Sequence, residues 1–286
     1  DLIEEIARLH GYDRIPSQPL RPQLRLRPSD PVQLRLRQAK QHLVARGYQE
    51  IISYSFVDPR LQAALDPETS PLPLANPISA ELAVMRTTLG CGLVQALRAN
   101  LSRQQDRGRL FELGLCFRPG SNGLEQPLHL GGLVWGNWNP EQWVVPAEAG
   151  GFYHLKGDVE QLLATLALDK VAAITYSSAT HPILHPGQSA ALYYQERLLG
   201  YVGMLHPRLA KQLDLPATVG IFELALAQLP LPVQPRYQPV SRFPAVRRDI
   251  AVVLVADVPA AHVLAAARIA AGPLLRDLCL FDHYQG

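Results

Sequence analysis

NPISAELAVMRTTLGCGLVQALRANLSRQQDRGRLFELGLCF, residues 76–117, combines a turn, a helix, a polar hinge and a strand in one continuous segment. Asn76 precedes a proline, and that position disfavours helical geometry, so a turn is expected there. Residues 89–101 predict a helix, because apolar residues recur at three- and four-residue spacing. These residues are Leu93, Val94, Leu97 and Leu101.

Residues 109–117 alternate with a period of two, which is typical of a strand. One face would carry Arg109, Phe111, Leu113, Leu115 and Phe117, and the other Leu110, Glu112, Gly114 and Cys116. A carboxylate in a buried strand is costly unless it is paired. We therefore expect Glu112 to lie at a wet edge or to pair with a nearby arginine, unless it is an active-site acid.

The composition is that of an ordinary globular protein long enough for one large domain or two. The 286 residues are 48% hydrophobic and 18% charged, and the net charge of +2 indicates neither nucleic acid nor membrane. The three cysteines, Cys91, Cys116 and Cys279, fit no zinc or disulfide spacing, which predicts small buried residues in a reducing cytoplasm. No apolar run reaches the roughly 18 residues of a membrane helix.

The first ten residues predict a short helix that Gly11 ends. Asp1, Glu4 and Glu5 stand at positions i, i+3 and i+4, so they are neighbours on its first turn. Acidic residues favour a helix N-terminus, and Glu4 can pair with Arg8, which needs no metal. Alternatively, Mg²⁺ bridges the carboxylates with further ligands from elsewhere, since it requires octahedral oxygen coordination.

The rest of the chain predicts an α+β fold on an antiparallel sheet, because short strands alternate with helices at hairpin-like spacing. Helices are expected at 31–46, 152–168 and 207–213, the second after a strand end. Strands are expected at 49–56, 128–138, 174–178, 189–194, 197–205 and 219–226. After a proline-rich linker, strand 249–255, helix 259–271 and strand 274–284 predict the first half of a ferredoxin-like unit.

Motifs for nucleophilic or phosphate-binding chemistry do not occur in this sequence, which contains no GxSxG, Walker loop or GxGxxG. The histidines lie mostly in turns and are expected to be structural, and Ser189 to bond locally. Residues 241–249, SRFPAVRRD, form the densest basic patch. Arg242, Arg247 and Arg248 could hold an RNA backbone while Phe243 stacks on a base, or they could be a solvated strand entry in which Arg248 pairs with an acid near Asp249.

Taken together, these segments resemble one family, the beta subunit of bacterial phenylalanine–tRNA ligase (phenylalanyl-tRNA synthetase), in its C-terminal portion. The resemblance covers nearly the whole chain in order. It rests on DLIEEIARLHGYDRIP, GYQEIISYSFVDP, VMRTTL, NLSRQQDRGRLFELG, FYHLKGDVE, LHPGQSAAL, YVGMLHP, SRFPAVRRDIAVV and LFDHYQG.

The resemblance implies a modular organisation. Residues 1–20 would be the tail of a small helical metal-site domain, 21–30 a linker and 31–226 a class II synthetase-like core. Residues 227–240 would be a proline-rich linker, and 241–286 the start of a ferredoxin-fold anticodon-binding domain whose remainder is missing. The partners implied are an alpha subunit and tRNA(Phe), in a heterotetramer of two alpha and two beta chains in the cytoplasm, with no membrane contact.

It also implies site residues. Asp1, Glu4 and Glu5 match the family's Mg²⁺ ligands, shared with the alpha subunit and completed by an upstream carboxylate, while ATP is bound by the alpha subunit. Arg242, Arg247 and Arg248 would contact RNA. No catalytic residue is assigned, because residues 110–113 read LFEL where active class II enzymes carry an arginine. A glycine-rich segment ending in arginine is also missing. A silent scaffold is therefore expected; an independent RNA-binding module and a diverged active enzyme remain alternatives.

Overall fold

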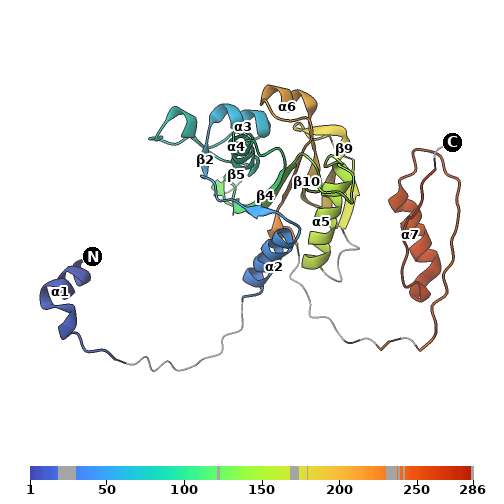
Figure 1. Ribbon diagram of the computed structural model, residues 1–286, viewed down its shortest axis with the longest axis horizontal. Helices are drawn as coiled ribbons and strands as arrows, with labels where there is room; N and C mark the ends of the chain where they lie inside the picture. Colours follow the sequence, from blue (N-terminus) through green and yellow to red (C-terminus); the bar gives the residue numbers. More distant parts are fainter. Residues whose placement is uncertain are drawn as a thin grey trace. The chain divides into compact units, whose positions relative to one another are not determined.

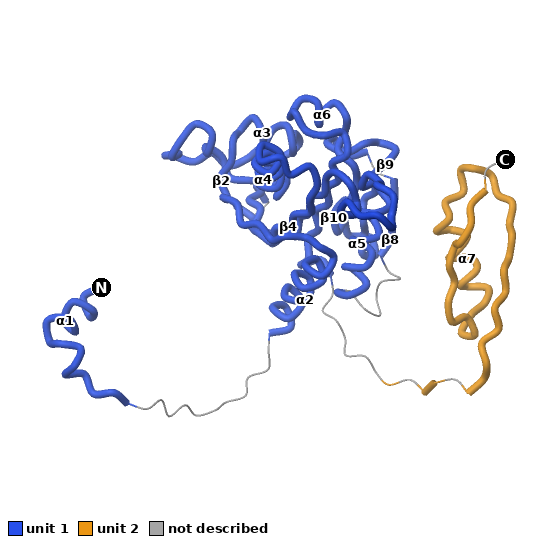
Figure 2. Tube along the Cα trace, in the orientation of Figure 1, with its two compact units in different colours: residues 1–235 blue, residues 236–286 orange. Residues whose placement is uncertain are grey.

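The computed structural model describes residues 1–18, 30–120, 123–167, 174–178, 180–229, 237, 239–240 and 242–284. It divides the chain into two compact units, Asp1–Pro235 and Arg236–Gly286 (Figure 2). The predicted linker at 21–30 lies outside the described residues apart from residue 30, as does most of the predicted linker at 227–240. In the described part of the chain, no helix is long and apolar enough to cross a membrane.

A seven-stranded sheet forms the centre of the first unit (Figure 1). In spatial order its strands are β1 (Gln49–Glu50), β4 (Gly108–Leu115), β7 (Leu128–Trp135), β11 (Val219–Leu224), β10 (Arg197–Leu205), β9 (Leu184–Tyr194) and β8 (Ile174–Ser177). Every neighbouring pair is antiparallel except β1 and β4. The predicted antiparallel sheet is therefore a mixed sheet with one parallel edge.

Helices cover both faces of this sheet. On one face, α2 (Pro31–Ala45) and α5 (Phe152–Ala167) pack on a core that contains Phe111. On the other, α3 (Pro59–Leu65), α4 (Gly90–Leu101) and α6 (Pro207–Gln212) pack on a core that contains Leu110. Adjacent residues of β4 thus enter opposite cores, as the period-two pattern predicts.

Local sequence signals set several of these helix boundaries. Asp30 caps α2, its carboxylate accepting a hydrogen bond from the Val32 amide at 2.9 Å, with Pro31 at the first helical position. Asp58 and Pro59 begin α3 in the same way. Helix α4 begins at Gly90, one residue after its predicted start, and ends at Leu101 as expected.

Several predicted boundaries or strands of the first unit differ in the structure. The expected strand 49–56 is two short strands in different sheets, because β2 (Phe56–Val57) pairs with β3 (Val84–Met85) instead of β4. After β1 the chain turns away from β4. At this turn the Ser53 amide donates a hydrogen bond to Glu112, and the Ser55 carbonyl accepts one from the Arg86 amide. Helix α5 begins at Phe152, and the strand end predicted before it does not form. Strand β7 ends at Trp135, before the predicted end at 138. Strand β11 ends at Leu224, before the predicted end at 226, and a 3-10 turn, Leu226–Gln228, follows it. Strand β9 starts at Leu184, five residues before its predicted start, because its pairing with β10 extends to Leu205.

A small hairpin of β5 (Arg118–Gly120) and β6 (Gly123–Glu125) connects β4 to β7, and a 3-10 turn, Ala80–Leu82, precedes β3. Near the start of the chain, α1 (Leu2–His10) ends at Gly11, whose φ of 96° suits glycine. A 3-10 turn, Tyr12–Arg14, follows it. The large apolar residues of α1 are exposed: Leu2, Ile3, Ile6 and Leu9.

The second unit contains α7 (Ala260–Ala271) and a 3-10 turn, Gly272–Leu274. The strands predicted at 249–255 and 274–284 do not form among its described residues, although the helix between them does. In a split βαβ unit the two strands that flank the helix pair with other strands inserted between or beside them. Residues 242–284 contain no strand that pairs with them, so neither segment is part of a ladder.

Buried positions for the cysteines are confirmed for Cys91 and Cys116 and wrong for Cys279, which is exposed in the second unit. None of the described side chains of that unit is buried, so the residue finds no core to enter. All three thiols are free. The local bond predicted for Ser189 is also wrong, since its buried hydroxyl has no partner among the described residues.

Candidate functional site: a polar row across the sheet

Three polar side chains and one glycine stand in register across four neighbouring strands, on the face that α3 and α4 cover; we call this the polar row. Glu112 of β4 pairs in register with Gly131 of β7, which pairs with Glu223 of β11, which pairs with Tyr201 of β10. The period-two geometry of strands places all four on one face. Because both carboxylates are only 3% exposed, each needs a partner inside the protein.

Arg86 supplies the partner of Glu112. Its Nη1 lies 2.7 Å from Glu112 Oε1 and 3.0 Å from Ser53 Oγ, and its Nε donates to the Leu115 carbonyl at 2.9 Å. Ser53 Oγ in turn donates to the second oxygen of Glu112 at 2.8 Å. The expectation that Glu112 pairs with a nearby arginine is confirmed, and the alternative of a wet edge is wrong.

The two threonines after Arg86 anchor the same segment to other elements. Thr87 Oγ1 donates to Asp66 at 2.5 Å, and its amide donates to Gln62 Oε1 at 3.1 Å. Thr88 Oγ1 donates to Glu223 Oε2 at 2.5 Å. The Arg-Thr-Thr segment therefore connects β4, α3 and β11 through buried polar contacts.

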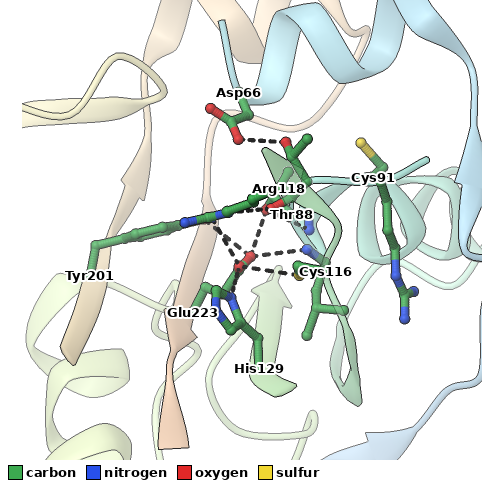
Figure 3. A network of polar contacts seen from close by, with 12 residues as sticks. Asp66, Thr88, Cys91, Cys116, Arg118, His129, Tyr201 and Glu223 are labelled. Atoms are coloured by element: carbon green, nitrogen blue, oxygen red, sulfur yellow. Dashed lines mark hydrogen bonds and ion pairs between the residues drawn. The ribbon is translucent and has the colours of Figure 1, made fainter. Parts of the chain in front are cut away.

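Glu223 is the most heavily hydrogen-bonded member of the row (Figure 3). Beside Thr88, it accepts from the Leu89 amide at 3.0 Å, and its Oε1 lies 2.6 Å from His129 Nδ1 and 4.0 Å from Arg118. Burial raises the pKa of Glu223. The hydrogen bond and charge of His129, the Thr88 hydrogen bond and the charge of Arg118 outweigh that effect and bring the pKa below its ordinary value. The carboxylate is thus held in its charged form.

Two glycines make room for these contacts. A Cβ on Gly114 would lie 2.1 Å from Arg86 Nη2, so no other residue lets the guanidinium lie across β4. A Cβ on Gly131 would lie 3.1 Å from the Leu89 Cβ. Since Leu89 follows Thr88 directly, this contact lets the segment sit close to the sheet.

A cavity of about 560 Å³ lies beside Glu223. Its lining includes Asp66, Thr88, Arg118, His129 and Tyr201, so one side of the polar row faces it. Within the described residues, Cys116, His129 and Glu223 are the three metal-capable groups whose ligand atoms lie within 4.8 Å of one another. Sequence reasoning missed this cluster, because no local spacing marks it: Cys116 follows β4, His129 is on β7 and Glu223 is on β11.

The predicted metal ligands Asp1, Glu4 and Glu5 are exposed on α1 and do not form such a three-group cluster in the described chain. The ion pair expected between Glu4 and Arg8 is replaced by a pair between Glu5 and Arg8 at 2.5 Å, because the i,i+3 spacing also brings those side chains together. Oxygen donors on one turn suit Mg²⁺ chemically, and completing its shell would require further ligands.

The predicted RNA-contacting arginines lie in the second unit. All three side chains, Arg242, Arg247 and Arg248, are exposed. Arg247, and not Arg248, pairs with an acid, its Nε lying 3.3 Å from Asp249 Oδ1. The structure therefore shows three exposed arginines and does not bring them together into one binding site.

Comparison with solved structures bears first on the fold. The structure is similar to that of a pyrrolysyl tRNA synthetase from Desulfitobacterium hafniense, with a TM-score of 0.51 over 69% of this chain and 67% of that one. At 15% identity this likeness concerns the fold alone.

The sequence comparisons then define the family. Residues 15–226 match the model of the phenylalanyl tRNA synthetase beta chain CLM domain, and residues 241–286 match the ferredoxin-fold anticodon binding domain. Two relatives, both named phenylalanine–tRNA ligase beta subunit, are 42% identical in Coxiella burnetii and 47% identical in Pseudomonas fluorescens, each across 100% of this chain. The chain belongs to the phenylalanyl-tRNA synthetase beta chain family, and it spans 36% of the length of these relatives.

Proposed function

We propose that this chain is part of the beta subunit of a phenylalanine–tRNA ligase, which attaches phenylalanine to tRNA(Phe) in the cytoplasm using ATP. Its role would be to scaffold a catalytic alpha subunit and to contribute to tRNA binding. Family membership and relatives at 42–47% identity over the whole chain support this assignment. Residues 31–226 would then be a catalytically silent class II synthetase-like core, in a heterotetramer of two alpha and two beta chains.

The proposal that this core is catalytically silent rests on one observation: Arg86, the arginine beside Glu112, is already bonded to groups inside the protein. Arg86 bonds to Glu112, Ser53 and the Leu115 carbonyl, and its side chain is only 4% exposed. Phosphoryl chemistry depends on positioned positive charge that meets the nucleotide. An arginine buried against a protein carboxylate cannot offer that charge.

The adjacent cavity supports the same conclusion. Its described lining residues include four carboxylates and one guanidinium: Asp66, Glu68, Glu125, Glu223 and Arg118. Such a lining repels the polyphosphate of ATP. The nucleotide would therefore bind to the alpha subunit, as the family resemblance implies.

ATP–pyrophosphate exchange with phenylalanine tests the proposal. The full-length protein alone should show only background exchange, and adding the alpha subunit should produce robust exchange. Robust exchange without the alpha subunit would show instead a diverged active enzyme. Failure of the two proteins to form a stoichiometric complex would favour an independent RNA-binding module, whose only support here is the exposed arginines of the second unit.

Two further assignments belong to this proposal. Asp1, Glu4 and Glu5 would hold Mg²⁺ together with a carboxylate from outside this chain, because exposed oxygen donors on one turn suit a hard cation. Arg242, Arg247 and Arg248 would contact tRNA phosphates, at the start of a ferredoxin-fold anticodon-binding domain over 241–286.

A further inference from the structure

The cavity beside Glu223 has no part in the function proposed above. It lies between Leu65 of α3 and Tyr201 of β10, on the sheet face that carries the polar row. Its volume of about 560 Å³ is in the range of sites that enclose small molecules. Figure 3 shows Asp66, Arg118 and Tyr201 around the Glu223 carboxylate.

The charges of the cavity lining determine whether a bound ligand would be a cation or an anion. Among the described lining residues, four carboxylates are opposed by Arg118 and by the charge of His129. The carboxylates are those of Asp66, Glu68, Glu125 and Glu223. The guanidinium is also engaged, since its Nε donates to the Thr87 carbonyl at 3.0 Å and its Nη2 lies 4.0 Å from Glu223. A concave site with an excess of carboxylates attracts cations and excludes anions.

One buried imidazole nitrogen in the same lining has no hydrogen-bond partner among the described residues. His129 is engaged instead, since its Nδ1 lies 2.6 Å from Glu223. His181 has a buried Nδ1 without a partner among the described residues, and its ring lies 4.2 Å from that of Tyr201. Buried polar atoms in proteins are normally hydrogen-bonded, so the position beside His181 Nδ1 calls for a ligand.

We propose that this cavity binds a small organic cation with a primary ammonium group and a compact apolar body. An ammonium carries three N–H donors and no acceptor, which complements imidazole acceptors and carboxylates. The apolar body would contact the aliphatic part of the lining, which includes Leu184, Ala190 and Leu198. Polar groups set the orientation of such a ligand, and the apolar wall supplies contact area.

A metal ion at Cys116, His129 and Glu223 is the competing occupant. Ligands of one tetrahedral zinc ion lie about 3.3 Å apart, given bonds of about 2.0–2.1 Å. His129 Nδ1 and Glu223 Oε1 are closer, at 2.6 Å, and form a hydrogen bond. The pKa of the Cys116 thiol is raised by burial and by Glu223, which opposes the thiolate that a metal needs. The present contacts would have to break for a metal to bind.

Calorimetric titration of the full-length protein, purified with its partner subunit, tests the proposal. The probes are pentylamine and pentanoate, which both contain five carbons and carry opposite charge, and Zn²⁺. We expect saturable binding of pentylamine at one site per chain and none of pentanoate. His181→Phe keeps a ring against Tyr201 and removes the nitrogen, so it should weaken pentylamine binding about fivefold or more.

The double substitution Glu68→Gln and Glu125→Gln should weaken binding about threefold or more by removing two charges from the lining. Glu141→Gln is the matched control, because Glu141 is exposed and is not one of the lining residues; it should leave the affinity unchanged. Equal binding of pentanoate, or unchanged pentylamine affinity in both cavity variants, overturns the proposal. Binding of Zn²⁺ alone, lost in Cys116→Ser, would assign the site to a metal instead.

Discussion

Arg86 and Glu112 form a buried ion pair, with Nη1 of the arginine 2.7 Å from Oε1 of the glutamate and both side chains at most 4% exposed. The pair closes the space between the segment that precedes α4 and the strand that follows it. Gly114 permits this approach, because a side chain there would collide with the guanidinium. The carboxylate in the middle of β4 is therefore a structural anchor.

Removing one member of this pair should strongly destabilise the protein. We expect Glu112→Ala to lower the free energy of unfolding by about 3–5 kcal/mol, because it leaves the Arg86 charge buried without a counterion. Urea denaturation of the purified protein measures the change. The double substitution Arg86→Met and Glu112→Leu should recover most of the loss; a double variant as unstable as the single one would contradict this account.

Acid should destabilise the first unit through Glu223 and His181. The folded-state pKa of Glu223 lies below its unfolded value, so its contribution is full above about pH 4.3 and is lost as the pH falls through the folded pKa. Burial also lowers the pKa of His181, against the opposing charges of Asp66 and Glu223, so that its contribution is lost as the pH falls below about 6.5.

The free energy of unfolding should therefore rise with pH over this range. Glu223→Gln should flatten the dependence between about pH 5 and 3, because it removes one of the titrating groups. The measurement is a series of urea titrations at fixed ionic strength. An unaltered slope in that variant would show that other carboxyl groups dominate acid unfolding.

Mg²⁺ binding, if it uses the first turn of α1, should depend on the carboxylates of Glu4 and Glu5. We expect Glu4→Ala and Glu5→Ala to weaken the Mg²⁺ dependence of the stability of the assembled ligase, measured by thermal melting with and without the ion. Glu141→Ala, a matched exposed substitution in another part of the chain, should have no effect. A dependence that survives both substitutions would favour the helix-dipole role of these acids.

The arginines of the second unit should contribute to tRNA affinity through phosphate contacts. We expect Arg247→Ala to weaken tRNA binding and to reduce the slope of log affinity against log salt by about one. Arg268→Ala, on α7, is a control for loss of one positive charge outside the 241–249 patch. Equal salt slopes for the wild type and Arg247→Ala would limit Arg247 to its contact with Asp249.

Local signals in the sequence predicted much of the first unit. Asp30 and Pro31 mark the start of α2, and the alternation along β4 assigns Leu110 and Phe111 to opposite cores, as the structure confirms. The strand pattern at 249–255 led to a wrong prediction, since an extended segment becomes a strand only where another strand pairs with it. The period of a sequence pattern indicates which side of a sheet a residue faces, but it does not provide the second strand that a sheet requires.

The polar row shows the same difference between what the sequence predicts and what the tertiary structure decides. The sequence alone established that Glu112 needs compensation, because the cost of burying an unpaired charge does not depend on the fold. The tertiary structure was needed to name Arg86 as its partner, and to bring His129 within 2.6 Å of Glu223, a residue 94 positions away. Such contacts depend on strand register and on the packing of helices against the sheet, which are set by the whole chain and leave no local spacing to read.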